Sequence, residues 1–108
     1  MMEKCVTIEV YGADQICASC VNSPSSKDTY EWLEAAISRK YPNQPFIMKY
    51  VDIFHPPDEV KAISFAQQVI ENDLFYPVVL IEGEIVAEGN PKLKDIFLKM
   101  ENYGYTTN

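Results

Sequence analysis

The chain has 108 residues, of which 47% are hydrophobic and 23% are charged, and its formal net charge is -7. This length predicts one domain over residues 1–108, and the hydrophobic content is that of a globular protein. An acidic surface repels phosphate backbones and anionic lipids, so neither nucleic acid nor a membrane is an expected partner. No apolar run reaches about 18 residues, and Met1 to Lys4 leads into an alternating segment rather than a signal sequence. We therefore expect a cytoplasmic protein.

The first predicted strand, Lys4 to Val10, is followed by two closely spaced cysteines. After a short break comes Cys17-Ala18-Ser19-Cys20. Two thiols at this spacing can share a disulfide, a metal ion or an iron–sulfur cluster. In an intracellular chain with a βαβ pattern they are typical of a thioredoxin-like redox motif. Pro24 lies four residues after Cys20, so a helix that began at the pair would be interrupted.

The third cysteine, Cys5, lies at the start of the same strand. Three unevenly placed cysteines do not make a secreted disulfide framework. An extended strand separates Cys5 from Val10 by roughly 16 Å, which argues against Cys5 as a third ligand beside the pair. We therefore expect Cys5 to be a reduced core thiol.

A helix, a strand and a second helix are predicted next. The first helix spans about Lys27 to Tyr41, and its buried stripe is Tyr30, Leu33, Ile37 and Tyr41. Phe46 to Ile53 is apolar on both faces apart from Lys49, which favours an interior strand. The second helix spans about Asp58 to Glu71, and its expected buried stripe is Val60, Ile63, Ala66 or Gln67, and Ile70.

A hairpin and a third helix complete the chain. Tyr76-Pro77 opens a strand from Val78 to Ile81, and Glu82-Gly83 turns the chain into a strand from Glu84 to Glu88. The last helix starts at Asn90-Pro91 and ends before Gly104. The order β-α-β-α-β-β-α predicts an α/β domain whose helices cover a four-stranded sheet. Its first βαβ unit should be parallel and right-handed.

This order, the cysteine pair after the first strand and the Tyr76-Pro77-Val78 segment together resemble the thioredoxin-like superfamily. Within it the chain resembles the YuzD-like family of bacterial proteins, which are described as disulfide oxidoreductases. The resemblance implies a mixed sheet in which the hairpin strands run antiparallel to the first two. It implies that Cys17 is the attacking thiol and Cys20 the resolving thiol. It also implies that Tyr76-Pro77 is a cis peptide beside the pair, where it contacts substrate.

The function expected from these features is a thiol–disulfide oxidoreductase or a redox-responsive protein that uses Cys17 and Cys20. Its partners would be protein thiols or disulfides, and no cofactor is expected. The alternative is a non-catalytic binding module in which the same two cysteines hold a soft metal, a metalloid or an iron–sulfur cluster, or in which the surface docks a protein. Two thiolates alone cannot complete a tetrahedral zinc site. The sequence leaves open whether the chain is an enzyme and whether it is a monomer or a homodimer.

Two further residues lie close to the predicted end of the second strand. His55, the sole histidine, is expected to be exposed, because a nucleophilic pair would require it beside Cys17. Asp52 is expected to be a strand-end carboxylate, with proton acceptance from Cys20 as its alternative role.

Overall fold

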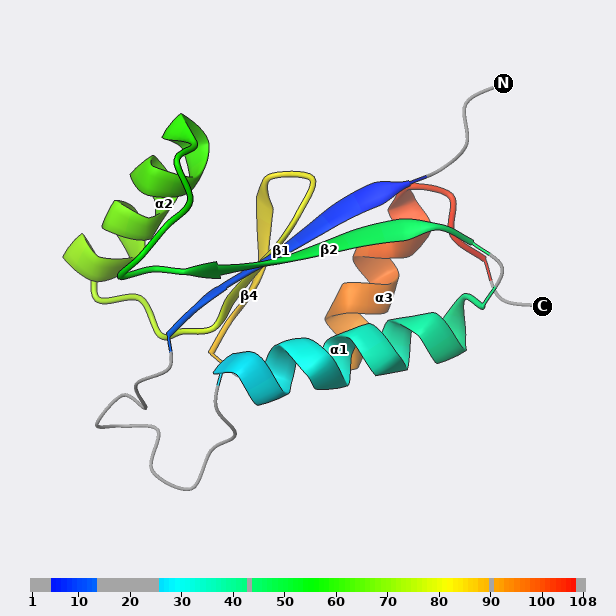
Figure 1. The fold of residues 1–108 in the computed structure, drawn as a ribbon. Coiled ribbons are helices and arrows are strands. Elements are labelled where there is room, and N and C mark those ends of the chain that lie inside the picture. Colours follow the sequence, from blue (N-terminus) through cyan, green and yellow to red (C-terminus); the bar gives the residue numbers. More distant parts are fainter. Residues whose placement is uncertain (1–4, 14–25, 43, 90, 107–108) are drawn as a thin grey trace.

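The structure is a computed structural model that describes residues 5–13, 26–42, 44–89 and 91–106 (Figure 1). Cys17 and Cys20 lie outside these residues. The elements are β1 (Val6–Gly12), α1 (Ser26–Lys40), β2 (Phe46–Asp52), α2 (Val60–Glu71), β3 (Val78–Ile81), β4 (Glu84–Glu88) and α3 (Leu93–Asn102). The predicted element order is confirmed, as are both boundaries of each hairpin strand. None of the helices in the described ranges is both long and apolar enough to cross a bilayer.

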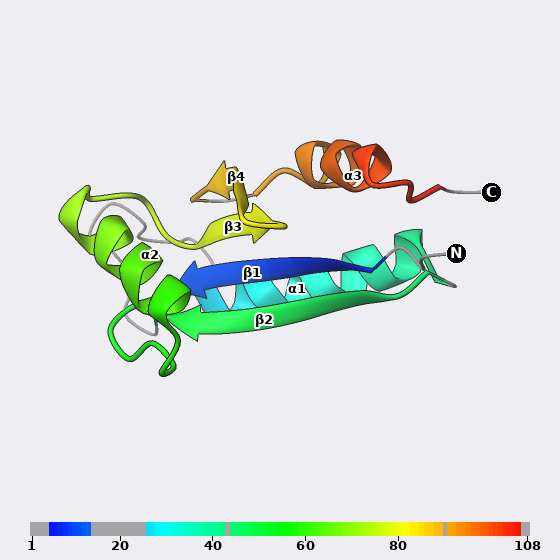
Figure 2. The ribbon, with the colours of Figure 1, turned by 90° about the horizontal axis from the view of Figure 1, so that it is seen from above.

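The four strands form one mixed sheet in the order β2-β1-β3-β4 (Figure 2). β1 and β2 are parallel, as predicted, from the pair Val6 and Phe46 to the pair Gly12 and Asp52. β3 runs antiparallel to β1, and β4 runs antiparallel to β3. The expectation that both hairpin strands oppose the first two is therefore wrong for β4. A hairpin reverses the chain, so only one of its strands can oppose β1 and β2.

β2 is an edge strand, and its predicted interior position is wrong. On one face, Phe46, Met48 and Tyr50 pack partly buried against the core beneath α1. On the other face, α2 reaches only Val51 and Ile53 at the strand's end. Ile47 is therefore 46% exposed, and Lys49 is exposed as well. Apolar residues on both faces of a strand do not require neighbours on both edges.

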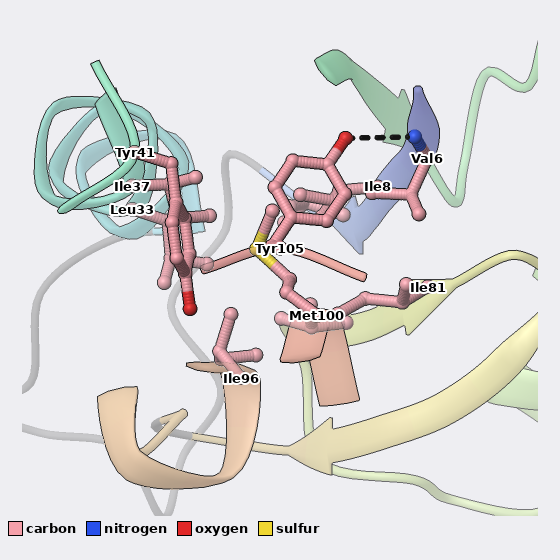
Figure 3. Close-up of a cluster of buried hydrophobic side chains, with 11 residues drawn as sticks. Val6, Ile8, Leu33, Ile37, Tyr41, Ile81, Ile96, Met100 and Tyr105 are labelled. Carbon is pink, nitrogen blue, oxygen red and sulfur yellow. Dashed lines mark hydrogen bonds between the residues drawn. The ribbon is translucent and has the colours of Figure 1, made fainter. Parts of the chain in front are cut away.

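The larger core lies between the sheet and the helices α1 and α3 (Figure 3). The α1 stripe is as predicted, because Leu33, Ile37 and Tyr41 are almost fully buried. Tyr105, just after α3, joins this core and anchors the chain there. The Val6 N–H donates to the Tyr105 hydroxyl over 3.0 Å, and that hydroxyl donates to the Pro45 carbonyl. The residues after α3 thus hold together the starts of the two parallel strands.

The smaller core lies on the opposite face, where α2 covers the ends of β1 and β2 (Figure 1). The inward side chains of α2 are Ala62, Ala66 and Val69, each at most 2% exposed. Of the predicted stripe, only Ala66 is therefore buried. Val60 is 85% exposed, and Ile63 and Ile70 are 37% and 43% exposed. The helix has two apolar stripes, and the one that contains Ala62, Ala66 and Val69, with Phe65 beside it, packs on the sheet.

Candidate functional site

Three chain segments meet at one end of the sheet, the end to which β1 and β2 point (Figure 2). Gly12, the last residue of β1, pairs with Asp52, the last residue of β2. Tyr11 pairs with Val78, the first residue of β3. Pro77 therefore enters the sheet where β1 leaves it. In the sequence, the segment that contains Cys17 and Cys20 begins directly after this end of β1.

The start of α1 returns to the same end of the sheet. A Cβ atom at Gly12 would overlap the side chain of Ser26, the first residue of α1, and would lie 3.3 Å from the Tyr50 hydroxyl. Glycine permits this close approach because it has no side chain. The described chain thus leaves at Ala13 and re-enters at Ser26 on the same side, and the two cysteines lie between these points in sequence.

The Tyr76–Pro77 peptide bond is cis, as the resemblance implied. Pro77 is buried and Tyr76 is half-buried. The end of β4 fixes this segment, since the Gly89 N–H lies 3.0 Å from both the Phe75 and the Pro77 carbonyl oxygens. The two cysteines lie outside the described residues. Their roles as attacking and resolving thiols, and their position beside Tyr76 and Pro77, stay predictions.

Tyr11, next to Gly12 at the end of β1, points to the face of the sheet that α2 covers. Burial, together with the negative charges of Glu9 and Glu59, raises its pKa to about 12. Its ring packs edge-on against Phe65 of α2, with 4.7 Å between ring centroids. The phenol is therefore neutral at physiological pH and links the end of β1 to α2.

Asp52 and His55 contact each other in the turn after β2. The Asp52 carboxylate accepts a hydrogen bond from the Phe54 N–H at 2.9 Å and lies 3.6 Å from His55 Nδ1. The His55 side chain is 85% exposed, so its expected exposure is confirmed. Asp52 thus stabilises a turn at the strand end. Proton exchange between Asp52 and Cys20 stays a prediction, because Cys20 lies outside the described residues.

Cys5 is exposed, so its predicted core position is wrong. It precedes β1 at the end of the sheet remote from Gly12. The alternation of the strand places it on the face of Thr7 and Glu9, and α2 covers that face only near the other end. In the described part of the chain, no three or more His, Cys, Asp or Glu side chains gather as they would around a metal ion.

A groove of about 290 Å³ lies beside this strand end and was not predicted from the sequence. Its walls are Ile53 and Phe54 after β2, Val69 and Ile70 of α2, and residues 73–76 before β3. We call it the α2 groove. Phe54 and Phe75, two large aromatic residues outside regular elements, are the signal in the sequence that could have indicated it.

A family model described as "Protein of unknown function (DUF1462)" matches residues 9–101. The chain belongs to the DUF1462 family. It is 59% identical over 107 residues to "Putative disulfide oxidoreductase YuzD" from Bacillus subtilis (strain 168), with 99% of each chain covered. The similarity to YuzD-like proteins is thereby confirmed.

A solved structure of a second relative supports the fold. The crystal structure titled as the protein of unknown function SA0789 from Staphylococcus aureus matches with a TM-score of 0.79 and 40% identity. The match covers 91% of this chain and 90% of that one. The DUF1462 chain therefore has an α/β fold with a four-stranded mixed sheet and three helices, an arrangement consistent with a thioredoxin-like fold.

Proposed function

We propose that the chain is a thiol–disulfide oxidoreductase or redox-responsive protein that uses the Cys17/Cys20 dithiol. The observation that carries this proposal is the 59% identity to the relative named "Putative disulfide oxidoreductase YuzD". The described structure supports it, because the segment with both cysteines departs from and returns to the end of the sheet where Pro77 enters.

The proposed chemistry is thiol–disulfide exchange in two steps. The Cys17 thiolate attacks one sulfur of a substrate disulfide, which forms a mixed disulfide and releases the other substrate sulfur as a thiolate. The Cys20 thiolate then attacks the Cys17 sulfur and releases the second substrate thiolate. The substrate gains two electrons, and the protein is left with a Cys17–Cys20 disulfide. A dithiol reductant returns it to the reduced state by the reverse exchange.

Thiol labelling with mass spectrometry across a glutathione redox series tests this proposal. Labelling of Cys17 and Cys20 should fall together, with one midpoint, as the buffer becomes oxidising. Labelling of the exposed Cys5 should not follow that midpoint. A Cys5→Ser variant is the matched control and should keep the midpoint unchanged. The proposal fails if both thiols label fully under oxidising and reducing conditions alike, or if the disulfide forms through Cys5.

Turnover should be slow even where the disulfide forms. A helix that began at the pair would meet Pro24 in its interior, so we expect a helix dipole to contribute little to the stability of the Cys17 thiolate. We expect weak activity in a generic disulfide-reductase assay. The metal-binding alternative is tested on the same sample by its metal content and absorption spectrum. A bound ion that is lost in Cys17→Ser would favour that alternative.

A further inference from the structure

The α2 groove shares Tyr76 with the predicted substrate contact, but its other walls, from the end of β2 and from α2, take no part in the proposed thiol–disulfide exchange. We propose that it docks an apolar side chain carried on a basic segment of a partner protein. This interaction goes beyond the proposed function and does not depend on the oxidation state of Cys17 and Cys20.

Exposed apolar side chains gather around this groove. Among the described residues, ten large hydrophobic residues are exposed, and five of them belong to α2 or to the segments that flank it. These five are Phe54, Val60, Ile63, Ile70 and Phe75. Scattered exposed hydrophobic residues are ordinary, whereas a contiguous group marks an interaction surface. Ile63 and Ile70 lie seven residues apart in α2, about two helical turns, and therefore on the same side of the helix.

The two phenylalanines of the groove are held in place by backbone hydrogen bonds. The Phe75 N–H donates to the Glu88 carboxylate at 3.0 Å, and the Phe75 carbonyl accepts from the Gly89 N–H at 3.0 Å. The Phe54 N–H is bonded to Asp52. Both rings nevertheless remain about half exposed, at 54% for Phe75 and 45% for Phe54. Aromatic side chains on a fixed backbone lose little entropy on binding, which makes them effective anchors.

The size and lining of the groove favour a side chain over a small-molecule ligand. Its volume of about 290 Å³ is at or below the roughly 300–1,000 Å³ of typical ligand pockets. Asp73 is the one charged residue in its lining, and the others are apolar or aromatic. Such a groove can hold one apolar side chain of an otherwise exposed segment.

The charges around the groove select a basic partner. Three carboxylates lie at the groove: Asp73 is in its lining, Asp52 accepts from the Phe54 N–H, and Glu88 accepts from the Phe75 N–H. The one cationic residue of α2 is Lys61, near the opposite end of the helix. A second copy of this chain would bring a further net charge of -7 and the same acidic rim. Charge repulsion therefore disfavours self-association here and favours a segment with Lys or Arg beside its apolar residue.

Binding of short peptides to the isotope-labelled full chain tests the proposal by NMR. The probe is a capped hexapeptide, Lys-Arg-Leu-Phe-Lys-Arg. One comparison peptide replaces the basic residues by Glu and Asp, and another replaces Leu-Phe by Ser-Ser. We expect amide shifts at Ile70, Leu74 and Phe75 with the probe alone. Its affinity should fall at least about threefold when sodium chloride rises from about 50 mM to about 500 mM. A Cys17→Ser/Cys20→Ser variant should bind equally well.

Variants separate the groove from other exposed apolar positions. Phe75→Ala should weaken probe binding about tenfold, and Ile70→Lys should abolish it by adding a cation to the groove. Asp73→Asn should weaken binding and reduce its salt dependence, and Asn tolerates the positive φ of 53° at this position. Leu98→Ala, which truncates a residue that is 51% exposed on α3, is the matched control and should bind as the unmodified chain does.

Three results would overturn the proposal. One is equal binding of the basic and acidic peptides, which would remove the charge selection. Another is a set of shifts on the open sheet face around Ile47 and Ile85 instead of the groove. The third is self-association through α2 at micromolar concentration without peptide, which would make a second copy the occupant. None of these results bears on glutathione titration of the cysteines, so the two proposals fail independently.

Discussion

Removing the Tyr105 hydroxyl while keeping its ring should destabilise the protein measurably. In Tyr105→Phe the Val6 N–H loses its acceptor at 3.0 Å, and the Pro45 carbonyl loses its donor. The ring contact with Tyr41, at 5.3 Å between centroids, is retained. A buried backbone group left without a partner costs about 1–3 kcal/mol. For a domain of this size that corresponds to a fall in Tm of roughly 5–20 °C.

Urea unfolding followed by circular dichroism measures this effect, with an unchanged m-value as evidence of an unchanged fold. Tyr103→Phe is the matched control, because Tyr103 is 39% exposed and its loss should stay within about 0.5 kcal/mol. If Tyr105→Phe is as stable as this control, the hydroxyl does not hold the starts of β1 and β2 together, and the reasoning is refuted.

Three further predictions concern stability. Burial and neighbouring carboxylates raise the pKa of Tyr11 from 10.0 to about 12. The contribution of the neutral phenol to the free energy of unfolding is therefore complete below pH 10 and is lost as the pH rises towards 12. In Tyr11→Phe, the free energy of unfolding should fall by about 2–3 kcal/mol less at alkaline pH than in the unmodified chain. An equal fall in both proteins would contradict this. Gly12→Ala should destabilise by about 1–3 kcal/mol or more through overlap with Ser26. Gly83→Ala has open space around the new methyl group but a φ of 82°, so it should cost only about 1 kcal/mol. If urea unfolding shows that Gly83→Ala is the more destabilising of the two variants, the packing argument is refuted. Ala66→Leu should cost about 1–3 kcal/mol, whereas Val60→Ala, at a site 85% exposed, should stay within about 0.5 kcal/mol. Equal losses by thermal unfolding would show that the faces of α2 are misassigned.

The sequence predicts those parts of the fold in which local chemistry and periodicity agree. The hairpin is an example, because Glu82 and Gly83 both adopt positive φ, at 52° and 82°, as a two-residue turn between strands requires. The α1 stripe is another, since Leu33 and Ile37 are buried on one side of the helix and Glu31, Glu34 and Arg39 are exposed, although Trp32 is 45% exposed as well.

The errors arise where periodicity allows two answers. In α2, large residues at Val60, Ile63 and Ile70 form one stripe, and Ala62, Ala66 and Val69 form another. A hydrophobic pattern does not say which stripe meets the sheet, because the distance between helix and sheet decides which side chains fit. The edge position of β2 depends on the strand order of the sheet, and the exposure of Cys5 depends on how far α2 extends over one face. Both are tertiary properties.

For the candidate site, sequence comparison contributed more than residue patterns. The cis peptide at Tyr76–Pro77 was implied by a family resemblance and is confirmed, whereas proline alone gives a low prior of about 5–6%. The α2 groove was missed because its walls combine residues 53–54 after β2 with residues 69–70 and 73–76 at the end of α2 and after it. Their apolar residues become one surface only when the chain folds.

The hydrogen bond between Val6 and Tyr105 also has a kinetic consequence. It joins residues 99 positions apart, and closing a loop of that length in an open chain costs about 4 kcal/mol of entropy. Such a contact forms late, after the sheet and α3 have assembled and have already reduced that entropy. Interactions absent from the transition state slow unfolding and leave the folding rate unaltered. The Tyr105 hydroxyl should therefore mainly lengthen the lifetime of the native state, because its hydrogen bonds form last during folding and break first during unfolding.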